Sequence, residues 1–242
     1  MIVLFTDFGL EGPYVGQMKA VLQTDAPGVP VLDLFADAPT HDPRAAAYLL
    51  PPYAAEFPAD SVFLCVVDPG VGGGRTPVMV AADGRWFVGP ENGLFAMVAR
   101  RAGDVRWWPI DWRPDRLSAS FHGRDLFAPT AARLALGQTP AGAPRPAADL
   151  DRPDWPDDLA EVVYVDRFGN AMTGLRAAVV PADALLEVAG RRLRRARTFA
   201  DVPEGAAFWY ENANGLAEIA VNRGRAVDVL NLGLGAAVGI AT

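Results

Sequence analysis

Three short polar segments in the first half of the chain carry residue types suited to acid–base chemistry. Residues 6–9 (TDFG) follow an apolar run at 2–5, residues 68–75 (DPGVGGGR) follow a run at 61–67, and residues 121–125 (FHGRD) precede a helical pattern. In α/β sheets, ligands bind beyond the carboxyl ends of the strands. We therefore expect the three segments to meet at one rim of a sheet.

Each segment also has a purely structural explanation. An Asp that ends a strand, such as Asp7, often caps a helix or forms a turn. The glycines of residues 70–74 suit a mobile turn, but a turn explains neither Asp68 nor Arg75 at its two ends. The segment lacks the Lys and Ser/Thr that end a phosphate-binding loop, and a strand-like run follows it. Because glycines let a backbone approach a ligand closely, we favour a functional interpretation of this segment.

Histidine and cysteine are scarce in this chain. The two histidines, His41 and His122, have no spacing typical of a metal site, so no metal is predicted. A lone histidine is more often structural, but His122 sits among Phe121, a glycine and two charged residues at a predicted strand-to-helix junction, which favours a function. The single cysteine, Cys65, lies in an apolar run and is predicted to be a buried, inert thiol.

Two segments of the second half could contact a ligand. Residues 166–170 (DRFGN) contain Gly-Asn and could simply form a turn. Residues 214–224 (NGLAEIAVNRG) are typical of a strand bounded by turns, with Glu218 on its polar face. Neither segment is specific by itself.

The elements that would position these residues follow from the hydrophobic pattern. Continuous apolar runs at 2–5, 29–35, 61–67, 77–82 and 85–89 alternate with helical patterns at 14–23, 43–50, 93–103 and 126–137. Such runs predict an α/β domain with a mostly parallel sheet covered by helices on both faces.

The second part of the chain has a different pattern. Residues 137–158 are crowded with Pro, Ala and Asp without apolar periodicity, as in a linker. Later segments are rich in β-formers, with Gly or Asn at the breaks. We therefore predict an α/β domain at 1–151 and a small all-β, barrel-like domain at 152–242.

Composition narrows the class of protein. Apolar residues make up 51% of the 242 residues, and the net charge is −7, which argues against a nucleic-acid partner despite the basic run at 191–197. The beginning of the sequence does not resemble a signal peptide, and no apolar stretch is long enough for a membrane helix. We expect a cytoplasmic protein without membrane contact.

Taken together, TDFG, DPGVGGGR, FHGRD, DRFGN and GLAEIAVNRG resemble, in order and spacing, the S-adenosylmethionine (SAM) hydroxide adenosyltransferase family, related to the fluorinating and chlorinating SAM enzymes. The resemblance spans nearly the whole chain. It implies an α/β domain, a C-terminal β-barrel, and a homotrimer that holds SAM between the N-terminal domain of one subunit and the C-terminal domain of its neighbour. It also implies hydrolysis of SAM to adenosine and methionine by attack of water at the ribose 5′ carbon, with SAM as the substrate and no cofactor.

The resemblance carries roles over to individual positions. It implies that Asp68, Arg75 and His122 are catalytic. It implies that Asp7 binds the ribose hydroxyls, that Asp166 binds the methionine ammonium, and that Phe168 stacks on adenine. The full set of implied substrate-binding residues is Asp7, Phe8, His41, Phe121, Asp166, Phe168, Asn170, Val221 and Arg223.

Two other functions compete with this one. The halogenating relatives have a tyrosine at position 68, an insertion near Arg75 and a serine at position 123, whereas this chain has Asp68, a short loop and Gly123. These differences favour water over halide as the nucleophile. A sensor that binds SAM or adenosine without chemistry is disfavoured because Asp, Arg and His are all retained. The relatives also have Ser-Arg where this chain has Ala213 and Asn214, so contacts to the methionine carboxylate are left open.

Overall fold

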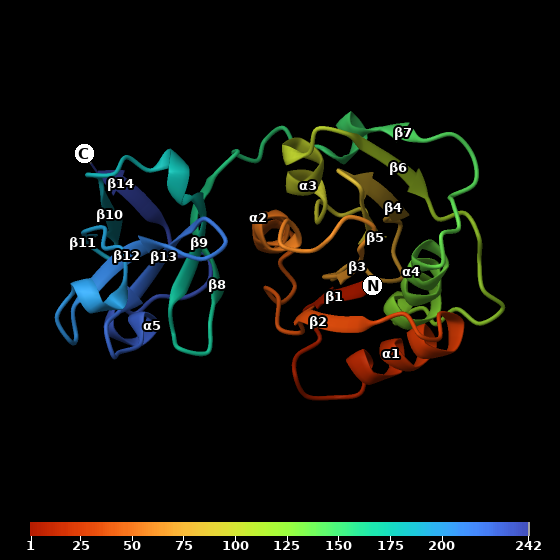
Figure 1. The fold of residues 1–242 in the computed structure, drawn as a ribbon, viewed down its shortest axis with the longest axis horizontal. Coiled ribbons are helices and arrows are strands. Elements are labelled where there is room, and N and C mark those ends of the chain that lie inside the picture. Colours follow the sequence, from red (N-terminus) through yellow and green to blue (C-terminus); the bar gives the residue numbers. More distant parts are fainter. Residues whose placement is uncertain (242) are drawn as a thin grey trace. The chain divides into compact units, whose positions relative to one another are not determined.

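A computed structural model describes residues 1–241 of the chain, which divides into two compact units. The first unit comprises residues 1–152 and the second begins at Pro153, one residue after the boundary expected from the linker-like composition (Figure 1). Each unit is built around its own buried apolar core, so each is described by itself.

The first unit contains one seven-stranded sheet. Its strand order is β2-β1-β3-β5-β4-β6-β7. The strands are β1 (Ile2–Thr6), β2 (Val31–Phe35), β3 (Val62–Val66), β4 (Pro77–Ala82), β5 (Arg85–Pro90), β6 (Val105–Pro109) and β7 (Arg145–Pro146).

The sheet is mixed, and the expectation of a mostly parallel sheet is wrong for half of it. Strands β2, β1, β3 and β5 run parallel, whereas β4 pairs antiparallel with both β5 and β6, and β6 pairs antiparallel with β7. The reason is local. Asp83 and Gly84 both have positive φ, 45° and 77°, as in a two-residue type I′ hairpin turn, so the chain reverses directly from β4 into β5.

Helices cover the sheet on both sides, as Figure 1 shows. Helices α2 (Pro43–Ala54) and α3 (Ala96–Arg101) lie on one side, and α1 (Tyr14–Asp25) and α4 (Ala128–Ala135) on the other. Helix α2 begins where Asp42 accepts a hydrogen bond from the Ala45 N–H at 2.9 Å and Pro43 occupies the first turn, two features that favour a helix start.

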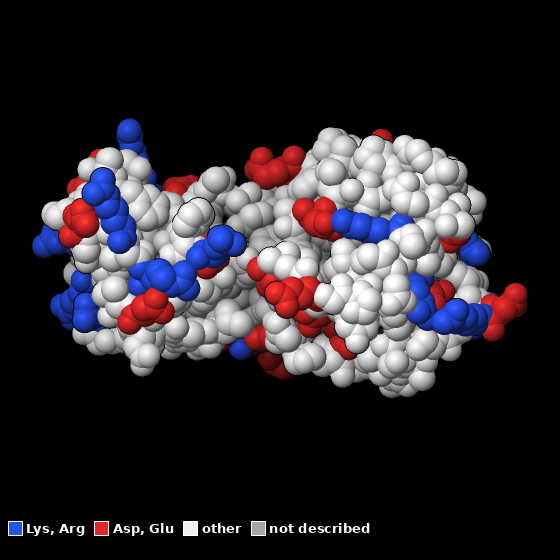
Figure 2. Space-filling model, turned by 90° about the horizontal axis from the view of Figure 1, so that it is seen from below, with Lys and Arg blue, Asp and Glu red and all other residues white. Residues whose placement is uncertain are grey.

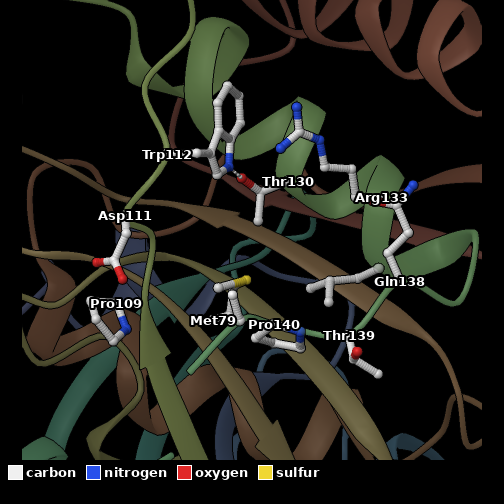
Figure 3. A pocket seen from close by; sticks show the side chains of 11 residues that line it. Met79, Pro109, Asp111, Trp112, Thr130, Arg133, Gln138, Thr139 and Pro140 are labelled. Carbon is white, nitrogen blue, oxygen red and sulfur yellow. Dashed lines mark hydrogen bonds between the residues drawn. The ribbon is translucent and has the colours of Figure 1, made fainter. Parts of the chain in front are cut away.

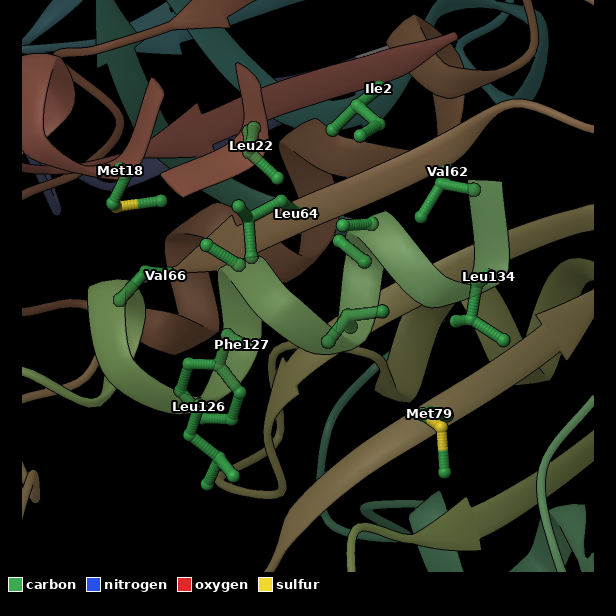
Figure 4. Close-up of a cluster of buried hydrophobic side chains, with 14 of the residues drawn as sticks. Ile2, Met18, Leu22, Val62, Leu64, Val66, Met79, Leu126, Phe127 and Leu134 are labelled. Atoms are coloured by element: carbon green, nitrogen blue, oxygen red, sulfur yellow. The ribbon is translucent and has the colours of Figure 1, made fainter. Parts of the chain in front are cut away.

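The apolar cluster beneath α1 and α4 anchors the rim that carries the polar segments. Met18 and Leu22 of α1, Leu64 of β3 and Phe127 before α4 are fully buried and point into one cluster (Figure 4). Burying side chains of this size contributes roughly 1.5–3 kcal/mol each. This packing therefore fixes the ends of β1 and β3, which Asp7 and Asp68 follow.

The second unit is all β apart from short helical turns. A four-stranded antiparallel sheet has the order β12-β13-β9-β8, and a three-stranded sheet has the order β11-β10-β14. A closed barrel stays a prediction. The elements are β8 (Leu159–Val165), β9 (Ala171–Arg176), β10 (Leu185–Val188), β11 (Arg191–Leu193), β12 (Ala207–Glu211), β13 (Leu216–Val221), α5 (Ala226–Val229) and β14 (Val238–Ala241).

The surface carries charged side chains of both signs, and the single cysteine is buried. Basic and acidic side chains are interspersed on the face in Figure 2, and within the basic run Arg192 and Arg195 pair with Glu187 and Glu211. The Cys65 thiol is fully buried, and burial raises its pKa, so it is poorly suited to nucleophilic chemistry. None of the helices within residues 1–241 combines the length and apolarity that crossing a bilayer requires.

Candidate active site

The three polar segments of the first unit meet at one pocket. Asp7 follows β1, Asp68 follows β3, and His122 precedes the short π-helix Gly123–Phe127 that leads into α4. The pocket has a volume of about 310 Å³. It is lined by Asp7, Phe8, Tyr14, Thr40, His41, Val66, Asp68, Val71, Ser120, Phe121, His122 and Gly123.

Asp68, Arg75 and His122 form a continuous chain of contacts beside this pocket. The Arg75 Nε donates to both carboxylate oxygens of Asp68 at 3.0 Å, and its Nη2 makes a further contact with Oδ2. The same Nη2 lies 2.8 Å from His122 Nδ1. The Asp68 side chain is 3% exposed and that of Arg75 10%, so this ion pair is shielded from water and from screening by salt.

This geometry fixes the protonation state of His122. A guanidinium has donors and no acceptor, so Nδ1 must accept the hydrogen bond from Arg75. The imidazole is therefore neutral, with its proton on Nε2, which is left to act as a donor. Burial first, and the Arg75 charge second, lower the pKa of His122 below its ordinary value, so its protonation requires a lower pH than that of a free imidazole.

The loop that carries Asp68 and Arg75 packs against the loop that leads to His122. Gly72 has φ of 79°, and a Cβ at this residue would lie 2.5 Å from the backbone oxygen of Ala119. Glycine is therefore required at this position for two reasons, backbone conformation and space. The segment before His122 is an irregular loop, because β6 ends at Pro109, so the predicted strand-to-helix junction is wrong at its strand side.

Asp7 and His41 lie together in the lining of the same pocket. The Asp7 carboxylate is 7% exposed and accepts the backbone N–H of His41 at 3.0 Å. Burial raises the pKa of Asp7 despite this hydrogen bond. The ring of His41 is 77% exposed, and its backbone has φ of 57°, so the residue offers Asp7 its main chain and leaves its ring open to solvent.

An aromatic cluster forms the rest of the pocket wall. Phe8, Tyr14 and Phe121 pack mutually, with ring centroids 5.3 to 5.8 Å apart. Sequence reasoning missed Tyr14, although its place at the start of the helix after TDFG could have indicated it. Gly123 lies beneath this cluster, where an added Cβ would be 3.2 Å from the Met18 sulfur.

The sequence-predicted residues of the second half form a separate pocket within the second unit. Its volume is about 620 Å³. Asp166, Phe168, Asn170, Val221 and Arg223 all line it, together with four residues that sequence reasoning missed: Phe199, Tyr210, Gly224 and Arg225. The aromatic Phe199 and Tyr210, whose ring centroids are 5.4 Å apart, come from different segments of the chain, and no local signal connects them.

The lining of this second-unit pocket is suited to recognition. Phe168 is 74% exposed on the turn between β8 and β9, so its ring is free to stack on a planar ligand. Asp166 closes the same turn, accepting the backbone N–H of Asn170 at 2.8 Å and its side-chain amide at 3.0 Å. Gly169 has φ of 80° and packs against the Arg225 side chain, which leaves no room for a Cβ.

A third hollow of about 240 Å³ lies between α4 and strands β4 and β6 (Figure 3). Its Trp112 indole donates to the Thr130 hydroxyl at 3.2 Å, and the Arg133 guanidinium lies 4.0 Å from the Trp112 ring centroid. These three side chains contact one another. None of the sequence-predicted site residues lines this hollow. Among residues 1–241, no group of three or more His, Cys, Asp and Glu side chains is arranged to hold a metal ion.

Comparisons with known proteins cover both units. Residues 2–143 match the SAM hydroxide adenosyltransferase N-terminal domain, and residues 160–239 match the C-terminal domain of the same family. The chain is 43% identical to an (R)-S-adenosyl-L-methionine hydrolase of Thermus thermophilus, covering 96% of this chain and 95% of the relative. It is 39% identical to a protein of the same name from Salinispora arenicola, with coverage of 93% and 91%. An uncharacterized conserved protein from Thermotoga maritima has a similar structure, with a TM-score of 0.87, 30% identity and full coverage of both chains.

Proposed function

The chain belongs to the SAM hydroxide adenosyltransferase family, and we propose that it hydrolyses SAM to adenosine and L-methionine. Water or hydroxide attacks the ribose 5′ carbon in line with the sulfonium. A C–O bond forms, the C–S bond breaks, its electron pair stays on sulfur, and one proton is released. The observation that carries this proposal is the contact chain of Asp68, Arg75 and His122 beside a pocket.

The chemistry suits a shielded site. The sulfonium is a cation that leaves as a neutral thioether, so attack by an oxygen with anionic character brings opposite charges together. Loss of the hydration shell around that oxygen, and a lower local dielectric, both favour the step. Holding the water in line with the leaving sulfur can by itself lower such a barrier by roughly 7–11 kcal/mol.

The contact chain supports complementary roles for its three residues around one water. Because His122 presents Nε2–H as a donor, it can hold the water oxygen but cannot take its proton in this state. Asp68 lines the pocket and keeps acceptor capacity beyond its bonds to Arg75, so we assign it the proton-accepting end. Arg75 acts mainly by holding the other two side chains in one geometry.

The substrate-binding roles follow the same division. In the first unit, the buried Asp7 carboxylate accepts hydrogen bonds from the ribose hydroxyls, while Phe8, Phe121 and the exposed His41 ring flank the sugar. In the second unit, Asp166 binds the methionine ammonium. There, Phe168 stacks on adenine, whose edge is read by Asn170 and by backbone groups at Val221 and Arg223.

We also propose a homotrimer in which the first-unit pocket of one subunit is completed by the second-unit pocket of a neighbour, with the second unit closed as a small barrel. The division of binding residues between two units supports this arrangement. Co-expression of Asp68→Asn with Phe168→Ala should produce sites that combine the wild-type kcat with the wild-type KM, because some sites then receive both intact pockets. Asp68→Asn alone lacks the wild-type kcat, and Phe168→Ala alone lacks the wild-type KM. An absence of complementation would contradict the shared site. A cytoplasmic location, the lack of a cofactor and the lack of a nucleic-acid partner stay predictions.

The names of the two hydrolase relatives specify the R configuration at sulfur, and we propose the same preference here. Anchoring both the adenosine and the amino acid end fixes two of the three substituents on the pyramidal sulfur. The methyl group then points in opposite directions in the two epimers, so one of them fits. An equimolar mixture of the two sulfur epimers should therefore be consumed to about half, and chromatography that separates the epimers should recover the S epimer.

The decisive experiment is incubation of the purified protein with the R epimer of SAM in oxygen-18 water. We expect adenosine that carries the label at its 5′ oxygen, together with unlabelled methionine. Recovery of both the R epimer and, in a separate incubation, the S epimer unchanged would show a sensor without chemistry. A parallel reaction with added chloride that yields 5′-chloro-5′-deoxyadenosine in place of adenosine would show a halogenase.

A further inference from the structure

Glu218 occupies an unusual place for an acidic residue. It lies in the middle of β13, a strand whose every residue is buried, and its own exposure is 2%. Its neighbours on the adjoining strands are Tyr210 of β12 and Met172 of β9. The opposite face of this sheet, with Ile219 and Trp209, packs into the apolar core. Glu218 therefore belongs to the face that carries Tyr210, a residue of the second-unit pocket.

The Glu218 carboxylate holds one side chain of the pocket wall and a neighbouring turn. One oxygen accepts the Tyr210 hydroxyl at 2.5 Å, and the other accepts the Asn212 side-chain amide at 2.9 Å. The Asn212 amide oxygen in turn accepts the backbone N–H groups of Asn214 and Leu216, each at 3.0 Å. Loss of the carboxylate would leave a phenol and a turn without their shared acceptor, which is costly at buried positions.

The charges of this region are arranged unevenly. The pocket arginines are paired with other acids, Arg223 with Glu204 at 3.0 Å and Arg225 with Asp228 at 2.9 Å. Asp166 and Glu218, in contrast, are hydrogen-bonded by neutral donors. Burial raises the pKa of Glu218, and the nearby Asp166 charge raises it further. Two neighbouring acids surrounded by neutral donors form a site whose negative charge a bound cation would offset.

We propose that Glu218 is a positioning and specificity-determining residue of the second-unit pocket, where it fixes Tyr210 and adds to Asp166 a second negative charge that selects substrates with a cationic amino group. This inference rests on the proposed function, in which Asp166 binds the ammonium of the methionine moiety. With 2% exposure, Glu218 acts through its field and through Tyr210.

The test compares SAM with a sulfonium analogue that lacks the α-amino group, using the wild type, Glu218→Gln and Tyr210→Phe. Removing the Glu218 charge should raise KM for SAM roughly tenfold, the order of magnitude expected for the loss of one attractive charge near a partly shielded cation. The KM for the analogue should change less than twofold, and kcat for both should stay within twofold. Tyr210→Phe keeps both charges, so it should raise the two KM values by the same factor and preserve the discrimination.

Glu211→Gln is the matched control. Glu211 lies next to Tyr210 on the same strand, but it is exposed and pairs with Arg195, so its substitution should leave both KM values unchanged. Equal rises in both KM values for Glu218→Gln, or no change in either, would overturn the proposal. A melting temperature for Glu218→Gln close to that of Tyr210→Phe establishes that the variant is folded.

Failure of the inference can be told from failure of the proposed function. If the wild type makes adenosine but Glu218→Gln discriminates as the wild type does, the inference alone is wrong. If the wild type makes no adenosine, the proposed hydrolysis is wrong. Calorimetric affinities for SAM and the analogue then decide the role of Glu218, with equal loss for both ligands in Glu218→Gln rejecting it.

Discussion

The pocket of the first unit and the pocket of the second unit differ in how their charged side chains are paired. In the first unit, Asp68, Arg75 and His122 are interlocked by short contacts, and the Asp68–Arg75 ion pair is shielded from solvent, so the charges of this trio have partners within the protein. In the second unit, the Phe168 ring is exposed, and the carboxylates of Asp166 and Glu218 are hydrogen-bonded by neutral donors. A bound ligand could therefore stack on the ring and offset the negative charge. A site whose charges are already paired within the protein is preorganised for a reaction. A site whose charges lack an oppositely charged partner is preorganised for binding a ligand of opposite charge.

From this difference we expect substitutions in the two pockets to affect different kinetic constants. Substitutions in the first-unit trio should act on kcat, because they disturb the groups around the attacking oxygen. Substitutions in the second-unit pocket should act on KM, because they remove contacts that the substrate makes before and during reaction.

The largest expected effect is that of Asp68→Asn. The amide cannot accept a proton, and its NH₂ group would face the Arg75 donors, so kcat should fall roughly 10²- to 10⁴-fold with KM within about twofold. Steady-state kinetics with SAM measure this effect. Asp33→Asn, which removes a surface pair with Lys19, serves as the control and should leave both constants unchanged. A KM that rises as much as kcat falls would place Asp68 in binding.

The pH dependence should also belong to the first unit. Protonation of His122 would place a proton on Nδ1, facing the Arg75 Nη2 at 2.8 Å, and break the contact. Because the pKa of His122 is lowered, kcat should hold as the pH falls to 6.5 and then decline roughly tenfold per unit below the shifted value.

The effect of His122 on stability has the same sign. The unfolded chain takes up this proton at its ordinary pKa of 6.5, before the folded protein does, so unfolding becomes easier as the pH drops below that value.

The control for the pH profile of kcat is Phe168→Ala, which should show the same inflection in kcat as the wild type. An inflection above pH 6.5 would be at odds with a neutral His122 held by Arg75.

Phe168→Ala should have a smaller effect, confined to affinity. Stacking of a base on an aromatic ring contributes about 1–3 kcal/mol, so KM should rise roughly tenfold while kcat is retained. The melting temperature should not change, because the ring is 74% exposed. Leu234→Ala, also an exposed apolar residue of the second unit, is the control. A fall in kcat as large as the rise in KM would contradict the assignment of Phe168 to binding alone.

The smallest effect tests how tightly the first-unit pocket is packed. In Gly123→Ala the new methyl group would lie 3.2 Å from the Met18 sulfur and 3.5 Å from Phe8. Overpacking of this kind costs about 1–3 kcal/mol, which should lower the melting temperature by a few degrees. Gly16→Ala, in α1 with open space around its Cβ position, should raise it slightly. An unchanged Gly123→Ala would mean that Met18 yields without strain.

Much of the arrangement could be predicted because it depends on local order along the chain. Asp7 and Asp68 follow buried parallel strands, so the topology of β1 and β3 alone brings them together. The hairpin that makes half the sheet antiparallel was also encoded locally, in Asp83-Gly84, but continuous apolar runs resemble parallel strands when both faces are buried. Tyr210 and Phe199 could not be predicted, since their contact depends on how the irregular loop between them folds back on β12.

The contact between Gly72 and Ala119 has an evolutionary consequence. A Cβ 2.5 Å from a carbonyl oxygen means that these two loops are fitted to each other without slack. We expect a change in the length of one loop to require a matching change in the other, because a shift of either backbone at this contact would bring atoms too close. A different nucleophile that needed a longer loop after Asp68 would therefore require changes in both loops.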